Sequence, residues 1–600
     1  MMVLEALDLL LTRFNKTDRK NQLITYAYDG LNRLTQKSYP DTTTVNYTYD
    51  LDSRLTQVTD PTGTYQFTFD NMGRLTSATT SYTFLTARTF TTGYSYDAAS
   101  NRTGFTDPEN GSTVYVYDTL NRLQTLTPPS AFSGTGSFGF SYDGLSRRAQ
   151  MTRPNNVATN YAYDNLSRLQ SVLHQLAGST IDGATYTVDN AGNRTAKTDQ
   201  RAAVTSNYGY DAIYELTGVT QGTNTTESYT YDPVGNRLSS LGVSPYSVNV
   251  SNQLTSIPGT SYTYDNNGDL LTKVVGSNTT TYVWDFENRL TSVTLPGSGG
   301  TVTFKYDPFG RRIYKSSSSG TSIYAYDDDV NLVEETNAAG TAVARYTQGL
   351  NVDEPLAMLR GGATSFYHAD GLGSVSSLSN TSGVLAQTYT YDSFSKVTSS
   401  SGSLTNPFQY TARELDPETN LYFYRARYFD SNVGRFLSED EVGNDEGVNL
   451  YLYVGNSPVD SSDPTGFYKL KGFPAGKTGD MNNAINNAIN KLKADCPSCA
   501  GPNGPKIAGA LGQATFVFAP NLKDCADTFK RDFLFIHIKR IRIGGNAFDP
   551  NKCCSLASTV AHEGYHLIQA KGQPDHPDVP GGPYDIEKKC FNCGTGHPPQ

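Results

Sequence analysis

The chain has 600 residues and a formal net charge of −10, a length that excludes a single hydrophobic core and predicts at least two domains. Its first 495 residues contain none of the seven cysteines and are rich in tyrosine, glycine, threonine and serine, which is typical of β structure with many turns. Residues 468–600 carry 16 basic and 11 acidic side chains, whereas residues 1–467 carry 32 and 47, so the two parts are expected to attract each other.

Residues 1–23 form an N-terminal segment without the features of a targeting sequence. Its apolar run, residues 3–12, contains two acidic residues and follows no basic residue, which argues against a signal peptide and against a transmembrane helix. No other stretch is long and apolar enough to cross a bilayer. We therefore expect no membrane span, and either export by other machinery or a chain that is the last part of a longer one.

Residues 24–400 repeat the pattern Tyr-x-Tyr-Asp, a turn, and Arg-Leu, first seen from Tyr26 to Leu34. Two tyrosines at i and i+2 share one face of a strand, aspartate ends the strand, and the turn leads into a return strand. Neighbouring aspartates are mostly 20 to 27 residues apart, a solenoid-type spacing, so we predict hairpins wound into one large twisted sheet. The later aspartates of the pattern are Asp50, Asp70, Asp97, Asp118, Asp143, Asp164, Asp189, Asp211, Asp232, Asp265, Asp285, Asp307, Asp327 and Asp392.

Residues 401–467 contain a series of short motifs. They are FQYTARELD from Phe408, LYFYRARYFD from Leu421, GRFLSED from Gly434, NLYLYVGNSP from Asn449 and DPTG from Asp463. Together with the repeats, these motifs resemble the RHS (rearrangement hotspot) family, which is related to Tc-toxin C proteins, and its repeat-associated core domain. The resemblance implies a hollow β shell that encloses a variable C-terminal toxin and is plugged at one end by the core domain. The fifteen or so repeats are fewer than that family's complete shells carry, so we expect the C-terminal portion of a larger system or a truncated copy.

The same resemblance implies that the shell cuts its own chain just after DPTG, near Phe467. It assigns the cut to an aspartyl-protease-like pair, Asp440 and Asp463, with Arg435 in a supporting role. Paired carboxyl groups suit this chemistry, because one must be protonated and one ionised to activate water, and two like charges in proximity push their pKa values apart. Asp463 before a proline is also an ordinary turn-forming residue.

The sequence HEGYH, His562 to His566, is the most specific motif of residues 468–600. Two histidines four residues apart lie on one face of a helix and can bind one Zn²⁺, with Glu563 beside it as general base. Residues 555–570 contain no proline and one glycine, as a helix requires. We predict a zinc metallopeptidase, in which the metal lowers the pKa of its bound water and Glu563 takes the proton. The alternative is an ordinary helix with a polar stripe.

A third zinc ligand is expected in addition to the two histidines, because a catalytic zinc has three protein ligands. Our choice is Glu587, 21 residues after His566, as in peptidases resembling thermolysin; His576, flanked by prolines, is the alternative. Tyr565 and Tyr584 are candidate oxyanion donors. A helix over 481–494, a strand over 533–543 and the HEGYH helix predict a small α+β, zincin-like domain.

The cysteines include two CxxC pairs, which predict either disulfides or a second, structural zinc site, with disulfides favoured. Their connectivity cannot be read from spacing. The pairs are Cys496 with Cys499 and Cys590 with Cys593, and Cys525, Cys553 and Cys554 remain.

The sequence thus predicts a mainly β protein that acts as a bacterial polymorphic toxin: an RHS shell that encloses and, by self-cleavage, releases a zinc peptidase. The expected partners are a cognate immunity protein, secretion or delivery machinery and a peptide or protein substrate, and the expected location is outside the cell or in a target cell. One alternative is a secreted or wall-associated, carbohydrate-binding YD-repeat protein with a disulfide-rich tail. Another is a nuclease toxin, suggested by the basic strand around Arg540, but no nuclease motif accompanies it and nucleic acid is not expected.

Overall fold

The computed structural model describes residues 15–132, 136–327, 330–441 and 449–467, and the backbone of strands within 469–544. The first sheet has 21 strands, each paired antiparallel with the next in the chain. Its strands are β1 (Asn15–Thr17), β2 (Leu23–Tyr28), β3 (Leu34–Ser38), β4 (Thr44–Tyr49), β5 (Leu55–Asp60), β6 (Gly63–Phe69), β7 (Leu75–Tyr82), β8 (Thr89–Tyr96), β9 (Arg102–Thr106), β10 (Ser112–Tyr117), β11 (Leu123–Thr127), β12 (Phe138–Tyr142), β13 (Arg148–Thr152), β14 (Val157–Tyr163), β15 (Leu169–Leu176), β16 (Ser179–Val188), β17 (Arg194–Asp199), β18 (Val204–Tyr210), β19 (Leu216–Gln221), β20 (Asn224–Tyr231) and β21 (Arg237–Ser240).

The second sheet continues the same antiparallel pattern with 16 strands. They are β22 (Ser247–Val248), β23 (Leu254–Ile257), β24 (Thr260–Tyr264), β25 (Leu270–Val275), β26 (Asn278–Trp284), β27 (Leu290–Thr294), β28 (Thr301–Tyr306), β29 (Arg312–Ser317), β30 (Gly320–Tyr326), β31 (Leu332–Thr336), β32 (Ala342–Gln348), β33 (Pro355–Arg360), β34 (Ala363–Ala369), β35 (Val375–Ser379), β36 (Leu385–Tyr391) and β37 (Val397–Gly402). The predicted mainly β, hairpin-repeat architecture is therefore confirmed, but the repeats form two large sheets and not the single sheet that the repeat pattern predicts.

The repeated Asp and Arg form a fixed unit at eight of the described turns, for example at the turn of Asp143. Its carboxylate accepts the backbone N–H of Arg147 at 3.0 Å and the Nε–H of the same residue at 2.6 Å. Ser146 takes a positive φ of 58°, which completes the turn. The Arg147 guanidinium lies 4.6 Å from the ring centre of Tyr163 and donates to Asp164 O, so this turn is tied to the next one.

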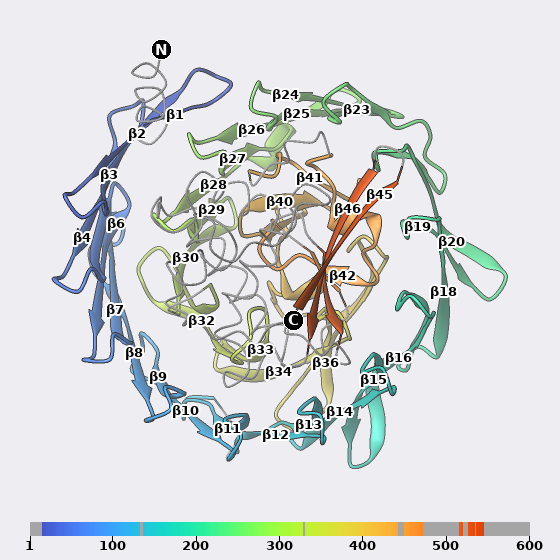
Figure 1. Ribbon diagram of the computed structural model, residues 1–600, viewed down its shortest axis with the longest axis horizontal. Coiled ribbons are helices and arrows are strands. Elements are labelled where there is room, and N and C mark those ends of the chain that lie inside the picture. Colours follow the sequence, from blue (N-terminus) through green and yellow to red (C-terminus); the bar gives the residue numbers. More distant parts are fainter. Residues whose placement is uncertain are drawn as a thin grey trace, which may run out of the picture.

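The chain runs around a ring and then continues inside it, so that early and late strands form two layers (Figure 1). Tyr82 Oη donates to Tyr324 O at 2.9 Å across the layers, and the rings of Phe138 and Phe366 are 5.9 Å apart. Tyr82, Phe138 and Phe366 belong to one apolar core that joins strands far apart in sequence. The tyrosine-rich faces of the hairpins are buried by this stacking, as a repeat that cannot bury its own face requires.

A buried polar joint connects the two layers near β16 and β35. Asp182 accepts hydrogen bonds from Ser376 Oγ at 2.7 Å and from Ser377 Oγ, and pairs with Arg201 at 3.0 Å. Arg201 also donates to Tyr389 O at 2.9 Å. Every charged group named here has a partner in the other layer or beside it. These directional contacts fix how the two layers are aligned with each other.

The third sheet belongs to the core domain and lies inside the ring (Figure 1). Arg312 on β29, whose side chain is 1% exposed, joins it to the inner layer by pairing with Glu414 at 2.8 Å and Asp416 at 2.5 Å. The strands are β38 (Glu414–Asp416), β39 (Leu421–Tyr424), β40 (Arg427–Asp430) and β41 (Arg435–Phe436). The described residues also form the short 3-10 helices η1 (Gly297–Gly299), η2 (Tyr410–Ala412) and η3 (Val454–Asn456).

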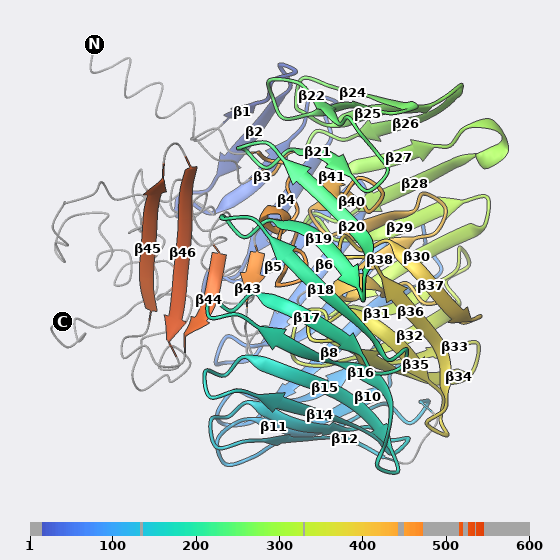
Figure 2. The same ribbon diagram turned by 90° about the vertical axis from the view of Figure 1, so that its right-hand side faces the viewer.

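A fourth sheet begins at β42 (Ser461–Ser462) and lies at one end of the ring (Figure 2). It contains β43 (Lys469–Lys471), β44 (Thr515–Ala519), β45 (Ala526–Phe533) and β46 (Ile536–Gly544), with β43, β44 and β46 parallel. Strand β46 overlaps the strand predicted over 533–543, whereas the predicted helix over 481–494 and the HEGYH helix lie outside the described residues. In the part of the chain that the structure describes, no helix has the length and apolar character needed to cross a membrane.

Candidate functional site

The two predicted aspartates, Asp440 and Asp463, meet at the guanidinium group of Arg427. Arg427 Nη2 is 3.0 Å from Asp440 Oδ2 and 3.5 Å from Asp463 Oδ2. The same side chain donates from Nη1 to Leu450 O at 3.0 Å and from Nε to Gly466 O. The three charged side chains are at most 10% exposed, so water screens their interactions little.

A tight hairpin places the side chain of Arg427 beside Asp440 and Asp463. Strands β39 and β40 pair directly at Tyr424 and Arg427, which leaves a two-residue turn in which Arg425 has a φ of 58°. The Arg427 guanidinium also lies 3.7 Å from the ring centre of Phe436 on β41, which fixes its plane. The register of this hairpin therefore decides which arginine of the RARYFD motif faces the aspartates.

The DPTG loop folds around the side chain of Asp463. Its Oδ1 accepts the backbone N–H of Gly466 at 2.8 Å and that of Phe467 at 3.1 Å. Gly466 has a φ of +82°, and a Cβ there would lie 2.5 Å from Tyr424 O. The positive φ and the close approach to Tyr424 O both require glycine at this position. The DPTG loop therefore packs the Gly466–Phe467 peptide bond against the β39–β40 turn.

The contacts converge on one peptide bond, between Gly466 and Phe467. Its carbonyl oxygen accepts a hydrogen bond from Arg427, and its N–H donates to Asp463. A cationic donor at a carbonyl oxygen stabilises the negative charge that develops there during hydrolysis, and carboxyl groups can transfer protons to and from water and the leaving nitrogen. The cluster thus has the groups that hydrolysis of this bond needs.

Arg435, the arginine that the sequence assigned to this site, lies elsewhere. It donates to Asn252 O in a turn of the shell, and its guanidinium is 5.0 Å from the ring centre of Tyr451. Sequence reasoning missed Arg427. The available signal was a charged residue in the largely aromatic run LYFYRARYFD. That run contains two arginines, and only the register of the hairpin shows which of them contacts the aspartates.

The predicted zinc ligands His562, His566 and Glu587 and the predicted base Glu563 lie outside the described residues. Among the described residues no group of three or more His, Cys, Asp or Glu side chains could hold a metal ion. The zinc prediction therefore still rests on the HEGYH motif alone.

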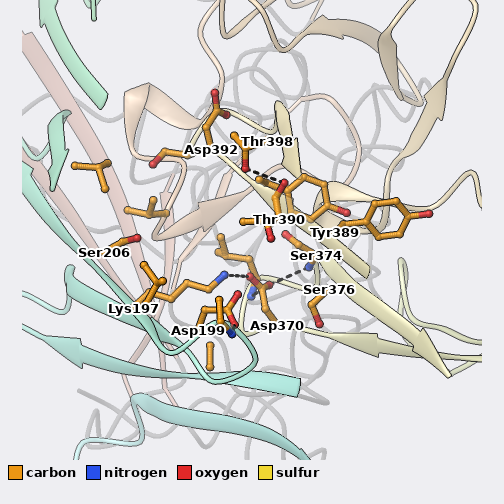
Figure 3. A pocket seen from close by; sticks show the side chains of 18 of the residues that line it. Lys197, Asp199, Ser206, Asp370, Ser374, Ser376, Tyr389, Thr390, Asp392 and Thr398 are labelled. Atoms are coloured by element: carbon orange, nitrogen blue, oxygen red, sulfur yellow. Dashed lines mark hydrogen bonds and ion pairs between the residues drawn. The ribbon is translucent and has the colours of Figure 1, made fainter. Parts of the chain in front are cut away.

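A separate cavity of about 300 Å³ lies between the two layers, lined mainly by residues of β16–β20, of β35–β37 and of the turn between β34 and β35 (Figure 3). Lys197 and Asp370 form an ion pair of 2.7 Å at its wall. Burial and the neighbouring Glu227 raise the pKa of Asp392 to about 7. None of the site residues predicted from the sequence lines this cavity, whose lining is rich in hydroxyl groups.

The family model described as Teneurin YD-shell matches residues 10–155 and 155–459. The chain belongs to this family. The match covers the two-layered YD shell and most of the core domain, and it ends just before the DPTG loop.

Solved structures show the same fold. The YD shell is similar to the Photorhabdus luminescens Tc holotoxin pore, with a TM-score of 0.62 and 17% identity over 76% of this chain and 26% of that chain. The crystal structure of TcdB2-TccC3-Cdc42 matches with a TM-score of 0.61 and 17% identity, over 76% of this chain and 27% of that one.

The curated relatives of this YD-shell chain include toxins. The tRNA3(Ser)-specific nuclease WapA of Bacillus spizizenii is 30% identical over 274 residues, which are 43% of this chain and 12% of the relative. Double-stranded DNA deaminase toxin A of Burkholderia cenocepacia is 25% identical over 315 residues, which are 43% of this chain and 22% of the relative. The chain thus spans less than a quarter of either relative.

Proposed function

We propose that this chain is the shell and core of a polymorphic toxin that cuts itself between Gly466 and Phe467 and so releases the segment that follows. The proposal rests on one observation: the carbonyl of that bond is hydrogen-bonded to Arg427 and its N–H to Asp463, with Asp440 on the same guanidinium. The toxin relatives support the class of protein. A cognate immunity protein and a delivery system are the partners such a toxin needs.

The proposed reaction is hydrolysis by the carboxyl pair. Water attacks the carbonyl carbon of Gly466 while Asp440 takes one of its protons, and Arg427 stabilises the oxyanion. Asp463, protonated before the reaction, gives its proton to the nitrogen of Phe467, whose N–H donates to Asp463 Oδ1 in the resting site, and the C–N bond breaks. The products are a carboxyl group at Gly466 and an amine at Phe467, so no other reactant is needed.

The full-length chain is expected to be recovered as two fragments, with Phe467 as the new N-terminus of the smaller one. Asp463→Asn is expected to remain a single chain of 65.3 kDa, because loss of an essential group in such a site slows hydrolysis by about 10³-fold or more. Mass spectrometry shows whether each protein is cut or remains a single chain, and N-terminal sequencing identifies the first residue of the smaller fragment. Asp460→Asn is the control, since Asp460 binds the backbone N–H of Arg194 instead. An uncut wild-type chain, or a cut Asp463→Asn chain, would contradict the proposal.

We further propose that the released segment is a zinc metallopeptidase, in which His562, His566 and Glu587 hold the zinc and Glu563 is the general base. Zinc, when bound there, supplies a water of lowered pKa and a Lewis acid. This proposal rests on the HEGYH motif. A nuclease is the second candidate, because WapA, a relative at 30% identity, is a tRNA nuclease.

The full-length chain is expected to contain about one zinc ion per molecule, and His562→Ala to lose it, because each histidine is an essential ligand. Elemental analysis of both proteins after dialysis measures the metal. His537→Ala, outside the motif, is the control. Zinc in neither protein, together with cleavage of tRNA by the purified chain, would favour the nuclease.

A further inference from the structure

A second arginine, Arg425, holds the loop that carries the proposed cut. It lies in the turn between β39 and β40 and donates from Nη1 to Pro464 O, two residues before the cut. The same guanidinium forms two bonds to Asp353, from Nη2 to Oδ1 at 2.6 Å and from Nη1 to Oδ2 at 3.2 Å. A bidentate arginine is held in one plane, so its remaining donor direction is fixed.

Asp353 lies in the shell, on the 349–354 loop between β32 and β33. The next residue, Glu354, pairs with Arg148 on β13 of the outer layer. Asp353 itself has a φ of +64°, and its N–H contacts Asn331 Oδ1 at 3.4 Å. The backbone that carries Asp353 is thus held by contacts to both layers of the shell, whereas the loop that its carboxylate serves belongs to the core domain.

The carboxylate of Asp353 balances the positive charge of two neighbouring arginines. Arg413 of the core domain also pairs with it, so one carboxylate serves two buried arginines. Burial and the neighbouring Arg425 lower the pKa of Arg413 well below its usual range. Without Asp353, two like charges would face each other with little water between them, and Arg425 would lose the partner that sets its direction.

We infer that Asp353 is a positioning residue for self-cleavage: through Arg425 it holds the DPTG loop at Arg427, so that the chain is cut only when the core domain has docked on the shell. The inference rests on the proposed function. Asp353 touches neither atom of the Gly466–Phe467 bond and is not itself catalytic. It links completion of the shell to release of the segment behind it.

The test follows cutting over time in pulse-labelled, full-length chains made by cell-free synthesis. Asp353→Asn is expected to cut about 10- to 100-fold more slowly, the size of effect that a small misplacement of reacting groups produces. Its pH–rate profile is expected to keep the wild-type shape, because Asp440 and Asp463 are unchanged. Arg425→Lys, which leaves Asp353 paired with a cation, is expected to slow cutting similarly, and the double variant to be no slower than the slower single one.

Glu418→Gln is the matched control, because it removes another ion pair between shell and core domain, Lys315 to Glu418 at 3.0 Å, which does not touch the DPTG loop. It is expected to cut at the wild-type rate. Wild-type cutting by Asp353→Asn, additive slowing in the double variant, or equal slowing by Glu418→Gln would overturn the inference while leaving the cut itself intact. A wild-type chain that is never cut would instead remove the proposed function.

Discussion

Arg427→Lys is expected to slow the cut between Gly466 and Phe467 by about 10²- to 10³-fold, the effect of removing one oxyanion donor. Lysine keeps the positive charge between Asp440 and Asp463. It has a single nitrogen, however, where arginine uses Nε for Gly466 O and Nη2 for the two carboxylates. The carboxyl pair would keep its cation, and the carbonyl would lose its polarising donor.

The same pulse-labelling assay measures this rate, and Arg435→Lys is the informative control. Both arginines belong to the core domain, both are buried, and the family resemblance pointed to Arg435. The structure places Arg435 against Tyr451 and Asn252, so its replacement is expected to leave the cut at the wild-type rate. The reverse result, a slow Arg435 variant and a normal Arg427 variant, would move the oxyanion donor away from Arg427.

Local features of the fold could be predicted because they are decided within a few residues. Asp143 and Arg147 lie four positions apart and meet in one turn, so the repeat pattern alone predicts the hairpin. The stacking of layers could not be predicted in this way. The contact of Phe138 with Phe366 joins residues more than two hundred positions apart, and any of many aromatic residues could have met there.

In the candidate site, too, some features could be predicted from the sequence and others could not. The family resemblance implies Asp440 and Asp463 as a pair, and both contact one guanidinium. Which arginine supplies it depends on where the two-residue turn falls, because the turn contains Arg425 and leaves Arg427 on β40. Asp353 could not be found from sequence at all, because it carries no motif and reaches the loop only through the packing of the core domain on the shell.

Arg312→Ala is expected to lower the free energy of unfolding by about 3 to 5 kcal/mol, because it leaves two carboxylates buried without their main partner. Arg312 is 1% exposed and pairs with both Glu414 and Asp416, and its guanidinium lies 4.5 Å from the ring centre of Phe423. Lys315, 3.2 Å from Asp416, offsets part of the charge but does not reach Glu414 in the described contacts.

Urea unfolding followed by tyrosine fluorescence measures this loss of stability. Replacing the two carboxylates with neutral amides then shows whether unpaired charge or lost packing causes it. If the cost comes from unpaired carboxylates, adding Glu414→Gln and Asp416→Asn to Arg312→Ala restores part of the stability, since neutral amides need no cation. If it comes from lost packing against Phe423, the triple variant is no more stable than Arg312→Ala. The first outcome is expected, and it predicts that Arg312→Ala also slows self-cleavage, because β38 anchors the domain that presents the DPTG loop to Arg427.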